Sequence, residues 1–169
     1  MKNSKIISTM EALKPIFIAV IASFIVLCFV RLTIVNGQSM EPNLYEKQKL
    51  LLNVTAYTFS DVERGDIIVA TPEEFDMEII KRVVGLPGET IEIRDNVIYI
   101  NGEALDEPYV KEEMVTADIP EFTLGANEYF ICGDNRNNSL DSRSEILGPI
   151  TKDEIFGKVI INFSKFEIL

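Results

Sequence analysis

Residues 77–84 read Met-Glu-Ile-Ile-Lys-Arg-Val-Val, and this stretch indicates the fold of the chain. Its aliphatic and β-branched residues favour an extended strand. The strand period of two places four side chains on one face, namely Met77, Ile79, Lys81 and Val83. Lys81 therefore shares its face with apolar side chains alone. Desolvation there would lower the pKa of the amine and suit it to general-base chemistry. The alternative is that the ammonium group reaches solvent from an edge strand.

Similar short runs recur through residues 36–169, separated by Gly, Pro, Asn and Asp, as is typical of strands joined by turns. We expect strands at Leu50–Val54, Ile67–Ala70, Met77–Val84, Thr90–Ile93, Val97–Ile100, Tyr129–Cys132 and Lys158–Phe163. Arg94-Asp95-Asn96 and Asn101-Gly102 have the composition of hairpin turns. Residues 151–156 could form a helical turn. The sequence thus predicts a mainly β domain of antiparallel sheets.

Residues 103–127 differ from the rest of this domain. They are acidic, contain two prolines and show no strong hydrophobic period. This composition indicates an extended or loosely structured insertion.

An apolar run at residues 15–35 precedes the domain, interrupted mainly by Ser23 and Arg31. Its length matches the ~20 residues that a helix needs to cross ~30 Å of hydrocarbon. We expect a cytoplasmic segment at 1–14, a transmembrane anchor at 15–35 and an extracytoplasmic domain at 36–169. The orientation follows from the three basic residues on the short N-terminal side, Lys2, Lys5 and Lys14.

A cleavable signal peptide is the competing interpretation of the same run. The apolar core of such a peptide is usually shorter, and no small-x-small cleavage site follows this one. Cleavage near Gly37 would also release the domain directly before Ser39. We therefore favour a retained anchor in the cell membrane.

Charge and cysteine content narrow the function classes. Residues 1–35 contain four basic and one acidic residue and therefore carry a net charge of +3. Because the net charge of the whole chain is −11, residues 36–169 carry −14. So acidic a domain repels a phosphate backbone, which argues against nucleic-acid binding. Cys28 lies in the apolar run and Cys132 in the domain, so we expect both to be unpaired and predict no thiolate metal site. No cofactor is expected.

Ser39-Met40-Glu41-Pro42 follows the apolar run within a few residues. A serine before a proline-containing turn commonly has only a turn role. The chain contains no histidine, so a Ser-His-Asp triad cannot form, and a nucleophilic Ser39 would need another base. Lys81 is the candidate. Gly37 would let the backbone bend closely around a substrate carbonyl, as part of an oxyanion site with the Ser39 N–H.

The third element is the polar loop Gly133–Arg143. A loop of this composition usually only turns the chain at the surface. It also contains hydroxyl groups that could orient an amine. Because a carboxylate touching Lys81 would raise its pKa and spoil the base, we expect Asp141 to pair with Arg143. The neutral Ser139 is then left to orient Lys81.

These segments resemble, in order, the conserved boxes of type I signal peptidases: Ser39–Pro42, Arg64–Ile68, Lys81–Glu89 and Gly133–Arg143. The preceding apolar segment is similar to the short single-span anchor of the Gram-positive forms. The resemblance implies a membrane-anchored serine endopeptidase that removes signal peptides from exported preproteins. It implies one N-terminal transmembrane helix, an antiparallel-sheet catalytic domain and a small cap inserted at residues 90–127.

The resemblance also implies residue roles. Ser39 is matched to the nucleophile and Lys81 to the general base, while the family's supporting positions fall on Ser139, Asp141 and Arg143. The implied partners are signal peptides and membrane lipid. We expect shallow apolar pockets that select small side chains at the first and third positions before the cut, near Met40, Ile79 and Ile80.

Two positions depart from the family pattern. Asn43 stands where threonine is usual after the proline. Gly37 stands where some members have a serine that donates to the oxyanion, so backbone donors would have a larger part here.

Two other functions are compatible with parts of the pattern. A self-cleaving Ser-Lys protease of the SOS-repressor type would use the same two residues, but the apolar segment and the acidic charge argue against it. A non-catalytic signal-peptidase-like factor for surface pilus assembly would have lost catalytic residues. Here Ser39 and Lys81 are both present, which favours the peptidase.

Overall fold

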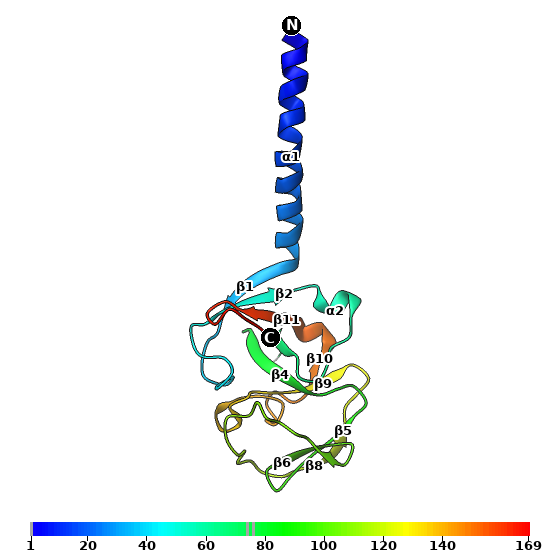
Figure 1. Ribbon diagram of the computed structural model, residues 1–169. Coiled ribbons are helices and arrows are strands. Elements are labelled where there is room, and N and C mark those ends of the chain that lie inside the picture. The colour runs from blue at the N-terminus through cyan, green and yellow to red at the C-terminus, as the bar shows by residue number, and fades with distance from the viewer. Residues whose placement is uncertain (1, 74, 76) are drawn as a thin grey trace.

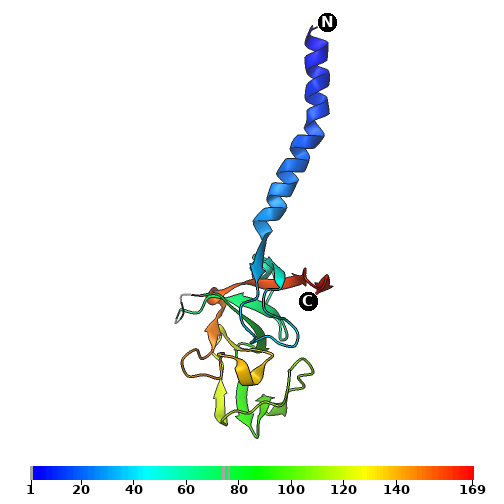
Figure 2. The ribbon, with the colours of Figure 1, turned by 90° about the vertical axis from the view of Figure 1, so that its left-hand side faces the viewer.

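The computed structural model describes residues 2–73, 75 and 77–169. A long N-terminal helix, α1 (Lys2–Phe29), projects from a β domain, and β1 (Val30–Ile34) follows it directly (Figure 1). The domain contains two sheets. The sheet that includes β1 lies next to the helix, and the second sheet lies at the far end of the molecule (Figure 2).

Within the described residues, the larger sheet has eight strands in the order β1-β2-β11-β3-β4-β9-β10, with β12 paired to β11. All pairings in it are antiparallel. The strands after β1 are β2 (Lys49–Asn53), β3 (Ile67–Ala70), β4 (Ile79–Gly85), β9 (Glu128–Cys132), β10 (Ile150–Thr151), β11 (Ile155–Asn162) and β12 (Glu167–Ile168).

The second sheet has the order β7-β6-β5-β8 and is also antiparallel. Its strands are β5 (Thr90–Arg94), β6 (Val97–Ile100), β7 (Glu103–Ala104) and β8 (Ile119–Thr123). Short helical turns complete the described fold, namely α2 (Ala56–Phe59), η1 (Arg136–Asn138) and η2 (Lys152–Glu154).

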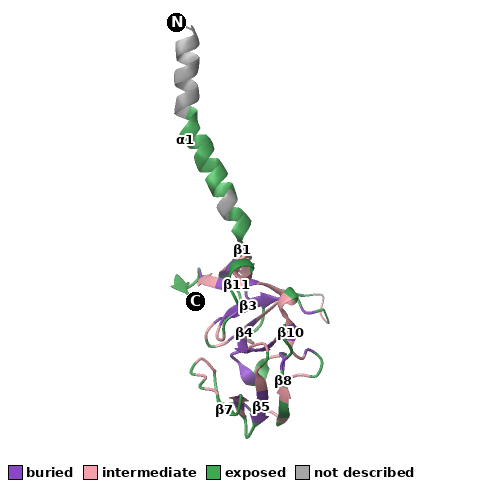
Figure 3. Cartoon of the chain, turned by 90° about the vertical axis from the view of Figure 1, so that its right-hand side faces the viewer, coloured by how far each residue is buried: buried purple, intermediate pink, exposed green. Residues whose placement is uncertain are grey.

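Buried apolar side chains of β4, β9 and β5 join the two sheets, and Figure 3 colours parts of β4 and β5 as buried. Phe130 of β9 is fully buried there against Ile91 of β5. Gly85 ends β4 at this junction, and a Cβ on it would lie 2.7 Å from Ile91 Cδ1 and 2.9 Å from Phe130 Cβ. Only glycine permits this close approach, so the end of β4 is held firmly between the sheets.

The prediction of a mainly β, antiparallel domain is confirmed. All seven expected strands are present, and those at residues 67–70 and 97–100 have the predicted bounds. Both predicted hairpin turns are present as two-residue loops with positive φ, at Asp95-Asn96 and Asn101-Gly102. The helical turn expected within residues 151–156 is η2.

The stretch at residues 103–127 is more ordered than predicted, because it contains β7 and β8. β8 includes Pro120 and, among the described strands, pairs only with β5, at the edge of its sheet. Proline is tolerated on such an edge, where one side of the strand needs no ladder hydrogen bond. The sequence pattern was weak because every described residue of this strand is exposed or half-buried.

The apolar run expected as one anchor at residues 15–35 is not a single helix. α1 ends at Phe29, and residues 30–34 pair with β2 in the register Val30↔Asn53 to Ile34↔Lys49. Strand pairing replaces helical hydrogen bonds for these largely β-branched residues. The part of the run that remains helical, residues 15–29, is about 22 Å long. No helix in the described part of the chain is long and apolar enough to cross a membrane.

Candidate active site

Lys81 and Ser39 lie in direct contact, although they are 42 residues apart in sequence. Lys81 is on β4, paired to Ile68 of β3, and only 5% of its surface is exposed. Its Nζ lies 2.9 Å from Ser39 Oγ, within hydrogen-bonding distance. The structure therefore unites the two residues that the sequence singled out, and it buries the lysine instead of letting it reach solvent.

The surroundings of Lys81 favour its neutral form. Burial lowers the pKa of Lys81; the nearby Asp141 carboxylate opposes this shift, and the Arg143 guanidinium reinforces it. Asp141 accepts hydrogen bonds from Arg143 Nε at 2.8 Å and Nη2 at 2.9 Å, so the predicted pairing of these residues is confirmed. This ion pair limits the influence of the carboxylate on the amine.

Asp141 itself is almost fully buried. Burial alone would raise its pKa, but the Arg143 guanidinium and the Gly133 N–H together hold the pKa of the carboxyl below its usual range. The ionised Asp141 carboxylate thus links the two ends of the polar loop, because it accepts hydrogen bonds from Gly133 at one end and from Arg143 at the other.

The turn that presents Ser39 is fixed from two sides. Met40 is 1% exposed and packs into the core of the larger sheet. Asn135 donates from its backbone N–H to the Ser39 carbonyl at 2.9 Å and from its side chain to the Gln38 carbonyl at 3.1 Å. Gly37 has a φ of +84°, in the left-handed region that favours glycine, so the chain can reverse just before the serine.

Gly133 allows the polar loop to approach this turn. A Cβ on Gly133 would lie 2.5 Å from the Ser39 carbonyl oxygen and 2.3 Å from Ser139 Oγ. No side chain fits in that space, so Gly133 is required for the loop to pack against the Ser39 backbone. Sequence reasoning placed Gly133 only at the start of the loop and assigned it no such contact.

Ser139 does not make the predicted hydrogen bond with Lys81 in this structure. Its Oγ is buried and makes no hydrogen bond of good geometry within the described residues, but it lies close enough to Asp141 to help lower the pKa of that carboxyl. The reason is geometric, because the hydroxyl lies against Gly133 while the Lys81 amine is directed to Ser39.

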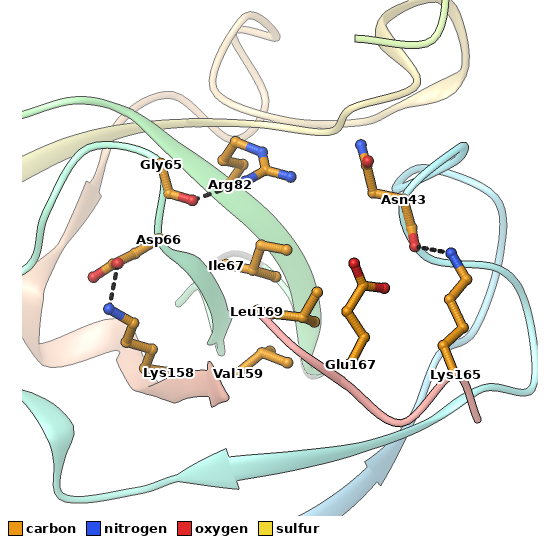
Figure 4. Close-up of a pocket in the computed structure, with 10 residues that line it drawn as sticks. All are labelled: Asn43, Gly65, Asp66, Ile67, Arg82, Lys158, Val159, Lys165, Glu167 and Leu169. Atoms are coloured by element: carbon orange, nitrogen blue, oxygen red, sulfur yellow. Dashed lines mark hydrogen bonds and ion pairs between the residues drawn. The ribbon is translucent and has the colours of Figure 1, made fainter. Parts of the chain in front are cut away.

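An ion pair that the sequence did not reveal lies next to Lys81. Arg82 donates from Nε to Asp134 Oδ1 at 2.8 Å and from Nη2 to Asp134 Oδ2 at 2.7 Å. It also donates to the Gly65 carbonyl at 2.9 Å (Figure 4). Asp134 is fully buried, and such bidentate pairing is the arrangement that compensates best for burying two charges. Strand alternation places Arg82 opposite Lys81, but its partner, 52 residues away, is a matter of tertiary structure.

A cavity of about 410 Å³ opens beside the Ser39–Lys81 contact. Residues 33–36, at the end of β1, and residues 77–81, at the start of β4, form its two walls. The predicted pocket residues Met40, Ile79 and Ile80 all line it. In the described part of the chain, β9 pairs with β4 only from Arg82 onward, so the edge of residues 79–81 on that side has no strand partner.

Within the described residues, no group of three or more acidic or cysteine side chains could hold a metal ion. Cys28 and Cys132 are both unpaired, as predicted. Burial raises the pKa of the Cys132 thiol, which keeps it neutral.

Comparison with known proteins assigns the chain to a family. Residues 9–164 match the family model described as signal peptidase, peptidase S26. The chain is 36% identical to signal peptidase I S of Bacillus subtilis strain 168 over 165 residues, covering 91% of this chain and 88% of that protein. It is 37% identical to signal peptidase I P of Bacillus subtilis subsp. natto over 166 residues, covering 92% of this chain and 88% of that protein.

A solved structure agrees with the sequence matches. The crystal structure of a signal peptidase I from Enterococcus faecalis V583 aligns with a TM-score of 0.51 and 32% identity, over 59% of this chain and 97% of that one. With a matching family model over nearly the whole chain and several relatives above 30% identity, the chain belongs to the signal peptidase I family, peptidase S26, and is a serine endopeptidase.

Proposed function

We propose that this protein cleaves N-terminal signal peptides from exported preproteins, with Ser39 as the nucleophile and Lys81 as the general base. The observation that carries the proposal is the 2.9 Å contact between Nζ of the buried Lys81 and Oγ of the half-buried Ser39, in a chain without histidine. A serine hydroxyl within hydrogen-bonding reach of a desolvated amine meets the geometric requirement for an activated nucleophile.

In the proposed mechanism, neutral Lys81 accepts the Ser39 hydroxyl proton as Oγ attacks the scissile carbonyl. The negative charge that develops on the carbonyl oxygen is stabilised near the Ser39 N–H and the Gly37 backbone. Lys81 then gives its proton to the leaving amine, which departs as the mature protein and leaves an acyl-enzyme. Neutral again, Lys81 activates a water molecule that releases the signal peptide.

The cavity supports an extended substrate lying between residues 33–36 and residues 77–81. The unpaired edge of residues 79–81 could add the substrate as a strand, with main-chain hydrogen bonds supplying affinity. Side chains of Met40, Ile79 and Ile80 would then limit the size of substrate residues at the first and third positions before the cut.

We also propose that α1 holds the domain at the cell membrane, with the N-terminal end cytoplasmic and the domain on the outer side. Apolar side chains of α1 are exposed to an extent unusual for a protein surface in water, for example Phe17 at 68%, Phe24 at 69% and Leu27 at 69%. The helix extends away from the domain, which leaves these side chains available to lipid (Figure 1).

Incubation of the purified protein in detergent with a preprotein, followed by sequencing of the new N-terminus, tests the proposed function. We expect one cut after the signal peptide. A bulky residue at the first position before the cut should lower kcat/KM by about 100-fold or more, because a small pocket cannot accept it. Cleavage only within the protein's own chain would identify a self-cleaving protease, and a folded protein without cleavage would favour the assembly factor.

The activity should depend on pH through Lys81. Burial lowers the pKa of Lys81 from the ordinary lysine value of 10.5, and only the neutral amine accepts a proton. We expect kcat/KM to fall as pH decreases through this lowered pKa and to level off above it. At a pH between the lowered pKa of Lys81 in the folded protein and its ordinary value in the unfolded chain, Lys81 is mostly protonated in the unfolded chain and mostly neutral in the folded protein. In that range the Lys81 contribution makes the free energy of unfolding rise with pH. A pH profile without an acid limb, or with one at 10.5, would contradict the assignment.

A further inference from the structure

The side chain of Asn43 bridges three separate segments near the active site. Its Nδ2 donates to Asp134 Oδ2 at 2.7 Å and to the Tyr109 carbonyl at 2.7 Å. A carboxylate and a carbonyl both require a donor, so the amide nitrogen alone can satisfy this pair of partners. Asn43 belongs to the turn that presents Ser39, and its backbone N–H donates to the Met40 carbonyl at 3.1 Å.

Asp134 connects the Asn43 side chain to the other residues of the site. Its carboxylate holds Arg82, the neighbour of Lys81 on β4. The next residue, Asn135, holds the Ser39 carbonyl at 2.9 Å. The contacts therefore form a closed ring that runs from the serine turn through Asn43, Asp134 and β4 back to the serine.

The connection between β7 and β8 in the second sheet packs against the same ring. The centroid of the Tyr109 ring lies 4.2 Å from the Arg82 guanidinium carbon. The Lys111 backbone N–H donates to the Asp134 carbonyl at 3.1 Å. Lys111 also forms an ion pair with Glu41 at 2.8 Å. Asn43 is thus linked to both the larger sheet and the segment that returns from the second sheet.

We propose that Asn43 is a positioning residue that sets the distance between Ser39 and Lys81, by tying the serine turn to the Arg82–Asp134 ion pair and to the Tyr109 backbone. The inference rests on the proposed Ser39–Lys81 chemistry. Figure 4 shows Asn43 and Arg82 on facing sides of one cavity, with Lys165 donating to the Asn43 carbonyl at 3.0 Å. The turn is therefore held from its backbone as well as its side chain.

Such a role predicts a loss in catalysis and not in substrate binding. An error of about 1 Å in the approach of nucleophile and base can cost about 100-fold in rate. Asn43 does not line the cavity between residues 33–36 and 77–81, so removing its amide leaves the substrate contacts in place. Threonine at this position keeps one donor for Asp134 and should preserve most of the alignment.

Steady-state cleavage of a preprotein, measured per folded enzyme, tests the proposal with three variants. We expect Asn43→Ala to lower kcat by about tenfold or more with KM within about twofold, and Asn43→Thr to restore kcat to within about threefold of wild type. Asn137→Ala is the matched control. Asn137 also links the polar loop to the β7–β8 connection, donating to the Glu113 carbonyl at 3.0 Å, and the hydrogen bonds described for its side chain all go to residues 112–115 of that connection. It should retain wild-type kcat.

Three results would overturn the proposal: wild-type kcat in Asn43→Ala, an equal fall in Asn43→Ala and Asn137→Ala, or a rise in KM alone. Failure of the underlying function would be distinct, because wild-type protein would then not cleave the preprotein at all.

Discussion

Lys81→Met abolishes preprotein cleavage, with an expected loss of about 10⁴-fold or more in kcat, while the protein remains folded. Methionine has nearly the length of lysine and no basic nitrogen, so the Ser39 hydroxyl keeps its place but loses its proton acceptor. The free energy of unfolding should be unchanged or slightly higher, because a nearly buried amine is replaced by an apolar side chain.

A second substitution separates basicity from charge. Lys81→Arg should also fail, because a guanidinium stays protonated at every pH at which the protein is folded. The measurement is the cleavage rate of each variant, together with a urea unfolding curve of the same preparation to show that the variant is folded. Activity within about tenfold of wild type in Lys81→Met, with an intact unfolding transition, would assign the base to another group.

Ser39→Ala is expected to be equally inactive, since removal of the hydroxyl removes the atom that forms the acyl-enzyme. The variant should still bind preprotein, because the walls of the cavity are unaltered apart from one oxygen atom. Its unfolding midpoint should stay close to that of wild type, because among the described residues the Ser39 hydroxyl has a single hydrogen-bond partner, Lys81.

Ser60→Ala is a suitable control for the same experiment. Ser60 directly follows α2, and its exposed hydroxyl donates to the carbonyl of Ala56, the first residue of that helix. This variant should cleave preprotein at the wild-type rate. If Ser39→Ala forms an acyl-enzyme or keeps more than about 1% of the activity, Ser39 is not the nucleophile.

Local pattern was sufficient for seven strands and two hairpin turns of the domain, but it did not predict β1, β7, β8, β10 or β12. Alternation in Ile79–Gly85 and the pairs Asp95-Asn96 and Asn101-Gly102 are short-range signals, and the structure contains the elements that they predicted. Pattern failed where a segment's conformation depends on a distant partner. Residues 30–34 continue the apolar run apart from Arg31 and Thr33, yet they form β1 because they pair with β2.

The same distinction between local signals and distant partners applies to the candidate site. The absence of histidine excluded a Ser-His-Asp triad and left Lys81 as the candidate base. A charge argument predicted that Asp141 pairs with Arg143. Residue chemistry alone could not reveal the Arg82–Asp134 ion pair, the need for glycine at position 133, or the bridge made by Asn43, because each involves residues brought together only by folding.

The sequence by itself determined which groups are available: a serine after an apolar segment, a lysine among apolar neighbours on a strand, and no histidine to compete with it. Only the tertiary structure decided their distances and burial. Pairing of β4 with β3 and β9 orients Lys81, while packing of the polar loop against the serine turn brings Ser39 within 2.9 Å of the amine. The pKa of that amine is lowered because the folded chain excludes water from it, and no local stretch of sequence can do so alone.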